Sequence, residues 1–461
     1  MPALMRCLYC GLLQDEPPGV KVCAHCGGEL VFEHEPPPNT YVQAQMYLDQ
    51  VSAPAGRIVS RHAIVTIQTP AQVPPEEAAP TTAGREPIGF VAVLDVSGSM
   101  AGEKIVSVKK AVEQAINRLH DGDTFSLVTF SNQARTVLKP TRVDERLRRK
   151  VKDLLRKIKA GGRTALDGGL ADGIKAALRR KHETNLVLLL SDGQANVGET
   201  NLEMVGWRAF EARQKGVTVS TLGVGSDYNE ALMVEIANQG GGRFYHVLHA
   251  RQIAPYVAGE LGEASALAAK AAALRMTLPP GTGIEPFSTA YTVEGTAVNL
   301  GDIPTDTNLE VVLRLLLPPQ EEGTRLAIGG DLVYRSPAGN ELTTPLNTVT
   351  LRYVAADEFT IETGAVEPVV RQVLGQMRAR QVLQTARTRA VAGASAADEE
   401  ARREMEELRA YASRLGADAA AEVATEQEQE LMEVTQAQDT AATKAVVNRA
   451  FSVQRGTKTF G

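Results

Sequence analysis

Oxygen-bearing side chains occur at three separated places in this sequence. They are Asp95, Ser97 and Ser99 in the run LDVSGSM, Thr164 in GGRTALDGG, and Asp192 in LLLSDGQ. Two carboxylates and three hydroxyls, with no histidine or cysteine among them, suit Mg²⁺, Mn²⁺ or Ca²⁺ better than zinc. Two carboxylates only neutralise a divalent cation, so the ion can still accept an acidic group from a partner protein. The pattern therefore indicates a site for binding rather than for catalysis.

Cysteine occurs only near the start of the chain, as two pairs. The pairs are Cys7 with Cys10 and Cys23 with Cys26, and twelve residues separate them. Four thiolates in this spacing predict a closed, structural zinc site in a small zinc ribbon. A pair of disulfides or a redox CxxC motif is the alternative, and His25 is a substitute ligand. Zinc is favoured because the start of the chain lacks the long apolar region of a secretory signal, which predicts a reducing, cytoplasmic location.

The first and last of the oxygen-bearing runs directly follow apolar segments. Ile88 to Leu94 and Leu186 to Leu190 are short and apolar on both faces, as in buried parallel strands. After Ser99 the apolar residues recur at helical spacing, which predicts a strand, loop and helix unit. Loops at the carboxyl ends of parallel strands meet in a crevice, where open α/β sheets bind ligands. Thr164 would reach this crevice on a third loop.

In this order, DVSGS, the later threonine and SDG resemble the metal-ion-dependent adhesion site (MIDAS) of von Willebrand factor A (VWA) domains. The flanking runs GEKI, GDTFSLVTFS and TLGVGSDYN agree with that resemblance. It covers residues 88 to 262 and implies that Ser97 and Ser99 bind the metal directly. It further implies that Thr164 binds directly or through water, and that Asp95 and Asp192 act through waters.

Changes in composition predict several domains on either side of this segment. Strand-like runs occur at residues 43 to 69 and again at 274 to 354, so we expect the α/β domain to be inserted in a β-sandwich. The fold class is thus a doubly wound, Rossmann-like α/β domain within an antiparallel sandwich, with a zinc ribbon and a C-terminal helical region. The expected ranges are 1–35 for the ribbon, 36–87 for a linker and the first sandwich strands, 88–265 for the VWA domain, 266–357 for the sandwich, 358–440 for about three helices, and 441–461 for a flexible tail.

Two further resemblances concern the partners. The VWA domain and sandwich resemble bacterial multidomain VWA proteins and inter-alpha-trypsin inhibitor heavy chains, and the full domain order resembles COPII inner-coat proteins. The first resemblance implies that a MoxR-type AAA ATPase or signalling kinases are functional partners of this protein. Thr457 and Thr459 in the predicted tail would suit a kinase and a phosphothreonine-binding partner. The coat resemblance implies the alternative of a structural subunit in which the VWA domain is a trunk and membrane association follows.

The composition excludes other classes of function. A net charge of −6 gives no general attraction to nucleic acid, and no apolar run reaches the roughly 20 residues of a membrane span. The sequence has no nucleophile elbow, phosphate-binding P-loop or HExxH motif, so we expect no enzyme activity. His246 and His249 flank a predicted strand and are interpreted as structural residues. The sequence therefore predicts a non-enzymatic scaffold or adhesion protein that binds an acidic side chain through a metal.

Overall fold

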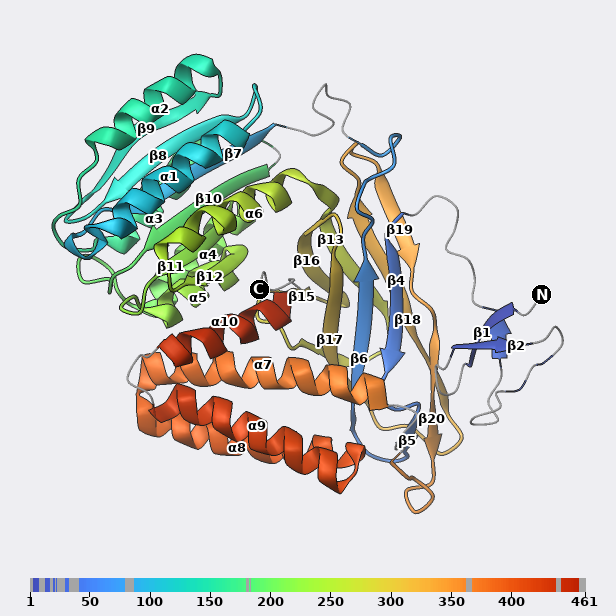
Figure 1. Cartoon of the computed structure of the whole chain (residues 1–461). Coiled ribbons are helices and arrows are strands. Elements are labelled where there is room, and N and C mark those ends of the chain that lie inside the picture. The colour runs from blue at the N-terminus through green and yellow to red at the C-terminus, as the bar shows by residue number, and fades with distance from the viewer. Residues whose placement is uncertain are drawn as a thin grey trace.

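The computed structural model describes residues 41–78, 87–179, 182, 184–361, 367–436 and 441–455. Of the first forty residues it describes 3–7, 13–16, 20, 22 and 30–32. The α/β domain, two further sheets and a group of long helices lie against one another (Figure 1).

The α/β domain is built on a mostly parallel six-stranded sheet. Its strand order is β12 (Gly241–Val247), β11 (Thr218–Val224), β10 (Thr184–Ser191), β7 (Ile88–Asp95), β8 (Thr124–Phe130) and β9 (Ala134–Arg142), and only β9 runs antiparallel to its neighbour. Every residue of the neighbouring strands β7 and β8 is buried, because helices cover both faces of the sheet.

The helices divide between the two faces according to the pleat of the strands. Phe90 and Leu94 of β7 pack with α1 (Glu103–Arg118), α2 (Glu145–Lys157) and α6 (Ile253–Ser265). Val91 and Val93 point to the opposite face and pack with α3 (Leu166–Arg179), α4 (Leu202–Gln214) and α5 (Glu230–Gln239). The switch of strand order at β7 and β10 leaves their carboxyl ends side by side, as a doubly wound sheet requires.

Two antiparallel-rich sheets lie beside the α/β domain (Figure 1). One has the order β15 (Thr292–Glu294), β16 (Ala297–Pro304), β13 (Leu267–Thr277), β18 (Arg325–Arg335), β20 (Val349–Val354) and β5 (Ser52–Pro54), with β19 (Glu341–Pro345) paired to β18. The other has the order β14 (Gly283–Pro286), β17 (Asn308–Leu317), β6 (Val59–Gln68) and β4 (Gln43–Leu48). Leu313 of β17 and Leu332 of β18 share one buried cluster, so the sheets enclose a common core.

Strands from before and after the α/β domain pair with one another in both sheets. β6 pairs with β17 over its whole length, from Val59 opposite Leu317 to Gln68 opposite Asn308. β5 pairs with β20 in the other sheet. The chain therefore leaves these sheets after β6, forms the α/β domain, and returns at β13.

The C-terminal part is a group of helices. These are α7 (Glu367–Ala392), α8 (Ala394–Ala412), α9 (Ala417–Gln436) and α10 (Ala441–Arg455). The turns after α7 and before α9 fall at Gly393 and Gly416, whose φ angles of 87° and 92° favour glycine. None of the helices in the described part of the chain is long and apolar enough to cross a membrane.

Residues 441–455 differ from the flexible tail that we expected from the sequence, because they form α10. One face of this helix is buried, with Lys444, Val447 and Phe451 each at most 2% exposed. The Lys444 ammonium donates to the Tyr228 carbonyl at 2.6 Å and to Glu230 at 2.8 Å. Buried polar residues interrupt the apolar pattern of this helix, so the sequence alone does not predict it. Contacts with the rest of the protein stabilise it. Thr457 and Thr459 lie outside the described residues.

The described part of the first forty residues forms a small antiparallel sheet. Its strands are β2 (Leu13–Glu16), β1 (Ala3–Cys7) and β3 (Leu30–Phe32), in that order. Cys7 ends β1, whereas Cys10, Cys23 and Cys26 lie outside the described residues, as does His25. The zinc site therefore stays a prediction.

Candidate metal centre

Asp95 is the buried anchor of the candidate site. It is the last residue of β7 and has no exposed surface. One carboxylate oxygen accepts a hydrogen bond from the Ser97 backbone N–H at 2.8 Å, and the other accepts from the Ser191 hydroxyl at 2.5 Å. Ser191 ends the neighbouring parallel strand β10, so the sheet itself brings the two loops together. Asp95 thus fixes the turn that carries Ser97 and Ser99.

Ser97, Ser99 and Asp192 form a chain of short oxygen contacts. The Ser97 and Ser99 hydroxyl oxygens lie 3.0 Å apart, and the Ser99 hydroxyl donates to Asp192 at 2.8 Å. Neighbouring ligands of an octahedral Mg²⁺ with bonds of about 2.05 Å are about 2.9 Å apart. Since the Ser99 proton is held by the buried Asp192 carboxylate, this hydroxyl has a lone pair to offer to a cation. The donors therefore fit the metal that the sequence predicts.

Thr164 reaches the same place from the loop before α3. The Gly162 carbonyl in that loop accepts from the Gly98 N–H at 3.0 Å, and the Thr164 N–H donates to Asn196 at 2.9 Å. A Cβ atom on Gly193 would lie 3.1 Å from the Thr164 hydroxyl oxygen and 3.5 Å from that of Ser99. Gly193 therefore keeps open the space between these two hydroxyls. All five residues predicted from the sequence meet at the carboxyl end of the sheet.

Lys104, in the first turn of α1, is a member of this site that the sequence analysis did not single out. Its ammonium group contacts the second carboxylate oxygen of Asp192, and its side chain is 28% exposed. A lysine one residue into a helix normally indicates only a solvated surface, and its contact with Asp192 depends on the fold. Lys104 adds a positive charge beside the place where a divalent cation would bind.

We expect a Lys104→Met substitution to strengthen Mg²⁺ binding by about tenfold. The ammonium repels a divalent cation and competes with it for the charge of Asp192, and tenfold corresponds to about 1.4 kcal/mol. Titration calorimetry on the two proteins measures the change. Lys110→Met, on an exposed part of the same helix, should leave the affinity unchanged. Weaker binding in Lys104→Met would show instead that the lysine positions Asp192 for the metal.

The two histidines have structural surroundings. His246 is buried in β12, where its Nδ1 lies 2.7 Å from the Tyr228 hydroxyl and its backbone N–H donates to Asn448. Burial, together with the charge of Lys444, lowers the pKa of His246 to about 4. The His249 backbone N–H donates to Gln252 in the turn before α6. Neither ring takes part in the hydrogen bonds of the metal-site residues described above.

Residues 90–256 match the family model of the von Willebrand factor type A domain. The chain contains a VWA domain. The match covers the six-stranded sheet from β7 to β12 and all five predicted metal-site residues.

Three similar proteins extend this comparison. An uncharacterised protein of Synechocystis is 28% identical over 272 residues, which are 56% of this chain and 64% of that protein. The mouse inter-alpha-trypsin inhibitor heavy chain 4 is 29% identical over 161 residues, which are 32% of this chain and 17% of that protein. The chain therefore spans less than two thirds of the length of either relative.

The third is a solved structure, a von Willebrand factor type A protein from Catenulispora acidiphila. It superimposes with a TM-score of 0.64 and 19% identity, over 92% of this chain and 99% of that one. The whole arrangement of VWA domain, additional sheets and C-terminal helices is thus a fold that occurs in another protein.

Proposed function

We propose that this chain is a protein-interaction module whose VWA domain binds a partner through a divalent cation, with Mg²⁺ as the principal ion. The meeting of Asp95, Ser97, Ser99, Thr164 and Asp192 at one end of the sheet carries the proposal. Neutral hydroxyls leave a bound cation electrophilic, so it attracts a carboxylate from an Asp or Glu of the partner. The metal would supply the bridge to the partner carboxylate, and the five protein residues would hold the metal in place.

The hydrogen bonds within the site support binding rather than catalysis. The Asp95 carboxylate is occupied by Ser97 and Ser191, and that of Asp192 by Ser99 and Lys104. Each oxygen of these two carboxylates accepts a hydrogen bond, so both groups are held in one orientation, as residues that position a metal and its ligands require. Turnover of a phosphate or peptide substrate that is lost in Asp95→Ala would contradict a purely binding role.

The way in which the VWA domain is connected to the two sheets also fits an interaction module. We propose that the two sheets act as one β-sandwich into which the VWA domain is inserted, so that two connections, β6 to β7 and α6 to β13, hold it. The pairing of β6 with β17 supports this. A stable pair of sheets in a chain without residues 39–70 would contradict the insertion.

Partner capture tests the proposal. The wild type and a Ser97→Ala, Ser99→Ala variant are compared in host lysate with Mg²⁺ and without chelators, which would also strip zinc. Ser60→Ala, at an exposed position on β6, is the matched control. We expect the double variant to lose an acidic partner that the control retains. A MoxR-type AAA ATPase and phosphothreonine-binding signalling proteins are the first candidates to look for.

The opposite result supports the second candidate. If the double variant retains every partner, binding uses the sheets, the helices or the N-terminal region. A structural role as a coat or assembly subunit then explains the chain better, and regular assembly on lipid or into oligomers independent of the metal site would support that role.

A further inference from the structure

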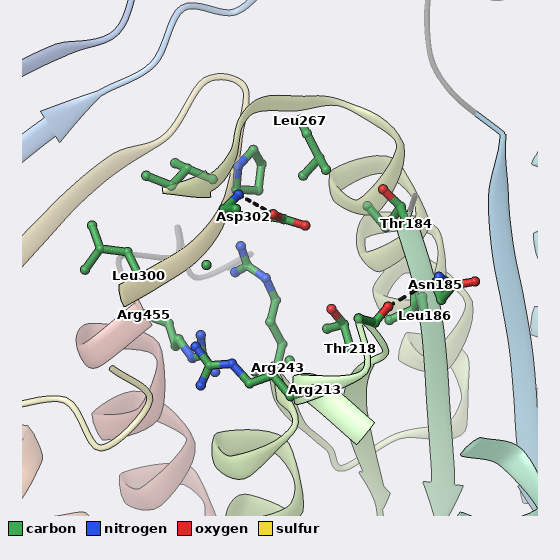
Figure 2. A pocket seen from close by; sticks show the side chains of 18 of the residues that line it. Thr184, Asn185, Leu186, Arg213, Thr218, Arg243, Leu267, Leu300, Asp302 and Arg455 are labelled. Carbon is green, nitrogen blue, oxygen red and sulfur yellow. Dashed lines mark hydrogen bonds between the residues drawn. The ribbon is translucent and has the colours of Figure 1, made fainter. Parts of the chain in front are cut away.

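A second site lies at the opposite end of the VWA sheet from the metal centre. A cavity of about 300 Å³ lies between the VWA domain, the seven-stranded sheet and the end of α10 (Figure 2). Thr184 and Thr218 mark the amino ends of β10 and β11 in its wall, and Asp302 of β16 faces them. Ligand sites often occur where domains meet, and this volume is at the lower end of their usual range of about 300–1,000 Å³.

Three arginines from three different elements line this cavity. Arg213 comes from α4, Arg243 from β12 and Arg455 from the last turn of α10. Their side chains extend into the same region in Figure 2. Arg213 packs over Gly241, the first residue of the strand that carries Arg243. A Cβ atom on Gly241 would lie 2.9 Å from the Arg213 Nε.

The Arg455 guanidinium has donor atoms that no described residue satisfies. Its Nε and Nη2 atoms are buried and have no hydrogen-bond partner within the described part of the chain. Leaving a buried charged donor without a partner is costly, at roughly 1–3 kcal/mol or more. Arg213 makes one hydrogen bond, from Nη1 to the Ala290 carbonyl at 2.7 Å. Neither of these two arginines forms an ion pair with the described residues. The cavity therefore offers unused donors.

Two acidic groups in the wall are held by other partners. Asp302 accepts from the Ala271 backbone N–H at 2.8 Å. Glu260 accepts hydrogen bonds from the hydroxyls of Ser220 and Tyr245. They offset part of the charge of the arginines without bonding to Arg213 or Arg455. The charged groups of the lining therefore keep an excess of one positive charge, and the Nε and Nη2 donors of Arg455 have no hydrogen-bond partner among the described residues.

The positive charges of three arginines lie close together in this cavity, which is unfavourable without a compensating group. Burial lowers the pKa of Arg455 to about 10, and the charges of Arg213 and Arg243 act in the same direction. Arg455 is still charged at neutral pH, so three guanidinium groups repel one another here. An anion between them removes this repulsion, and the planar fork of arginine matches the oxygens of a phosphate group.

We propose that this cavity binds a small phosphorylated ligand, with its phosphate group held by Arg213, Arg243 and Arg455. The hydroxyls of Thr184 and Thr218 and the carboxyl of Asp302 then face the rest of the ligand, which favours a polar, hydroxyl-bearing body such as a sugar. The volume of about 300 Å³ suits a small molecule. A bound ligand contacts the VWA domain, the sheet and α10 together, and so stabilises their arrangement.

Calorimetry and thermal unfolding with defined probes test this site. The probes are inorganic phosphate, pyrophosphate and glucose 6-phosphate, with glucose as the uncharged comparison. No divalent metal is added, so that no metal–phosphate complex forms at the VWA site. Arg455→Met keeps an unbranched side chain and removes its charge. Arg243→Gln is the second variant, and Arg146→Gln on an exposed part of α2 is the matched control.

We expect at least one phosphate probe to bind the wild type and the control with a Kd below about 1 mM, and at least tenfold more weakly to either cavity variant. The melting temperature should rise with the same probes and follow the same order. Phosphate also stabilises proteins by exclusion from their surface, and that effect is common to all four proteins. Equal stabilisation of wild type and Arg455→Met, with no heat of binding, would overturn the proposal.

Discussion

An Asp95→Asn substitution is expected to lower Mg²⁺ affinity by about a hundredfold and to abolish Mg²⁺-dependent partner binding. Substitutions of groups that orient metal ligands typically cost 10–100-fold in affinity, and this one also removes one of the two negative charges facing the ion. The asparagine can still accept the hydrogen bond from the Ser97 N–H, so the loop should keep its shape. Titration calorimetry with Mg²⁺, or with Mn²⁺ as a paramagnetic probe, measures the loss.

The melting temperature of Asp95→Asn distinguishes a loss of Mg²⁺ binding from misfolding of the variant. Burial raises the pKa of Asp95, and the nearby charge of Asp192 acts in the same direction, although hydrogen bonds from Ser191 and Ser97 oppose them. The metal-free protein therefore carries an unfavourable buried charge that the asparagine removes. We expect Asp95→Asn without metal to melt no lower than the wild type, and to lose the rise in melting temperature that Mg²⁺ gives the wild type.

Asp123→Asn is the matched control in the same domain. Asp123 is equally buried, but its carboxylate accepts from the backbone N–H groups of Ile88 and His120, away from the metal loops. An asparagine can serve only one of these donors well. This control should lose about 1–2 kcal/mol of stability and keep its Mg²⁺ affinity. Unchanged Mg²⁺ binding in Asp95→Asn would contradict the assignment of the metal centre.

The sequence predicted the metal centre because its residues are tied to strand ends. Asp95 and Asp192 each directly follow an apolar run, and the carboxyl ends of adjacent parallel strands must meet. Lys104 could not be found in this way. Its contact with Asp192 depends on how the first turn of α1 lies over the neighbouring loop, and no spacing in the sequence encodes that position.

The second cavity and α10 show a different limit of sequence analysis. Arg213, Arg243 and Arg455 are separated by 30 and 212 positions, and each alone is typical of a solvated surface. They meet only because α10 packs against both the VWA domain and α7. α10 itself buries Lys444 and Gln454 along with its apolar residues, so polar residues occupy positions of its buried face that a sequence pattern assigns to solvent. Buried polar residues are satisfied by tertiary partners that local sequence does not show.

The second large effect is expected at Asp49, where Asp49→Ala should lower the free energy of unfolding by about 3–5 kcal/mol. Asp49 is fully buried between the four-stranded sheet and the C-terminal helices. It accepts from the backbone N–H and the ring Nδ1 of His62, both at 2.9 Å, from Arg414 at 2.7 Å and from the Tyr411 hydroxyl at 3.2 Å. Removing the carboxylate leaves these donors without their acceptor. Urea unfolding followed by circular dichroism measures the loss.

Glu407→Ala is the control, because Glu407 also joins the helices to the sheet, through Arg314, but is 44% exposed. An ion pair of this kind is worth at most about 1 kcal/mol, so the control should be close to the wild type. If Asp49→Ala cost no more than Glu407→Ala, the buried group around Asp49 would not be what holds the helices on the sheet.

The same carboxylate gives a pH dependence that an asparagine cannot reproduce. Burial alone would raise the pKa of Asp49, but the hydrogen bonds and charges of His62 and Arg414 outweigh it and hold the pKa at about 2. The unfolded chain, with a pKa near 3.9, binds a proton first as the pH falls. The stability from this shift, about 2 kcal/mol, is therefore complete above about pH 5 and lost between about pH 4 and pH 2. The stability difference between wild type and Asp49→Asn should shrink over that interval, and a difference that stays constant from pH 6 to pH 3 would show that the charge of Asp49 does not stabilise the fold.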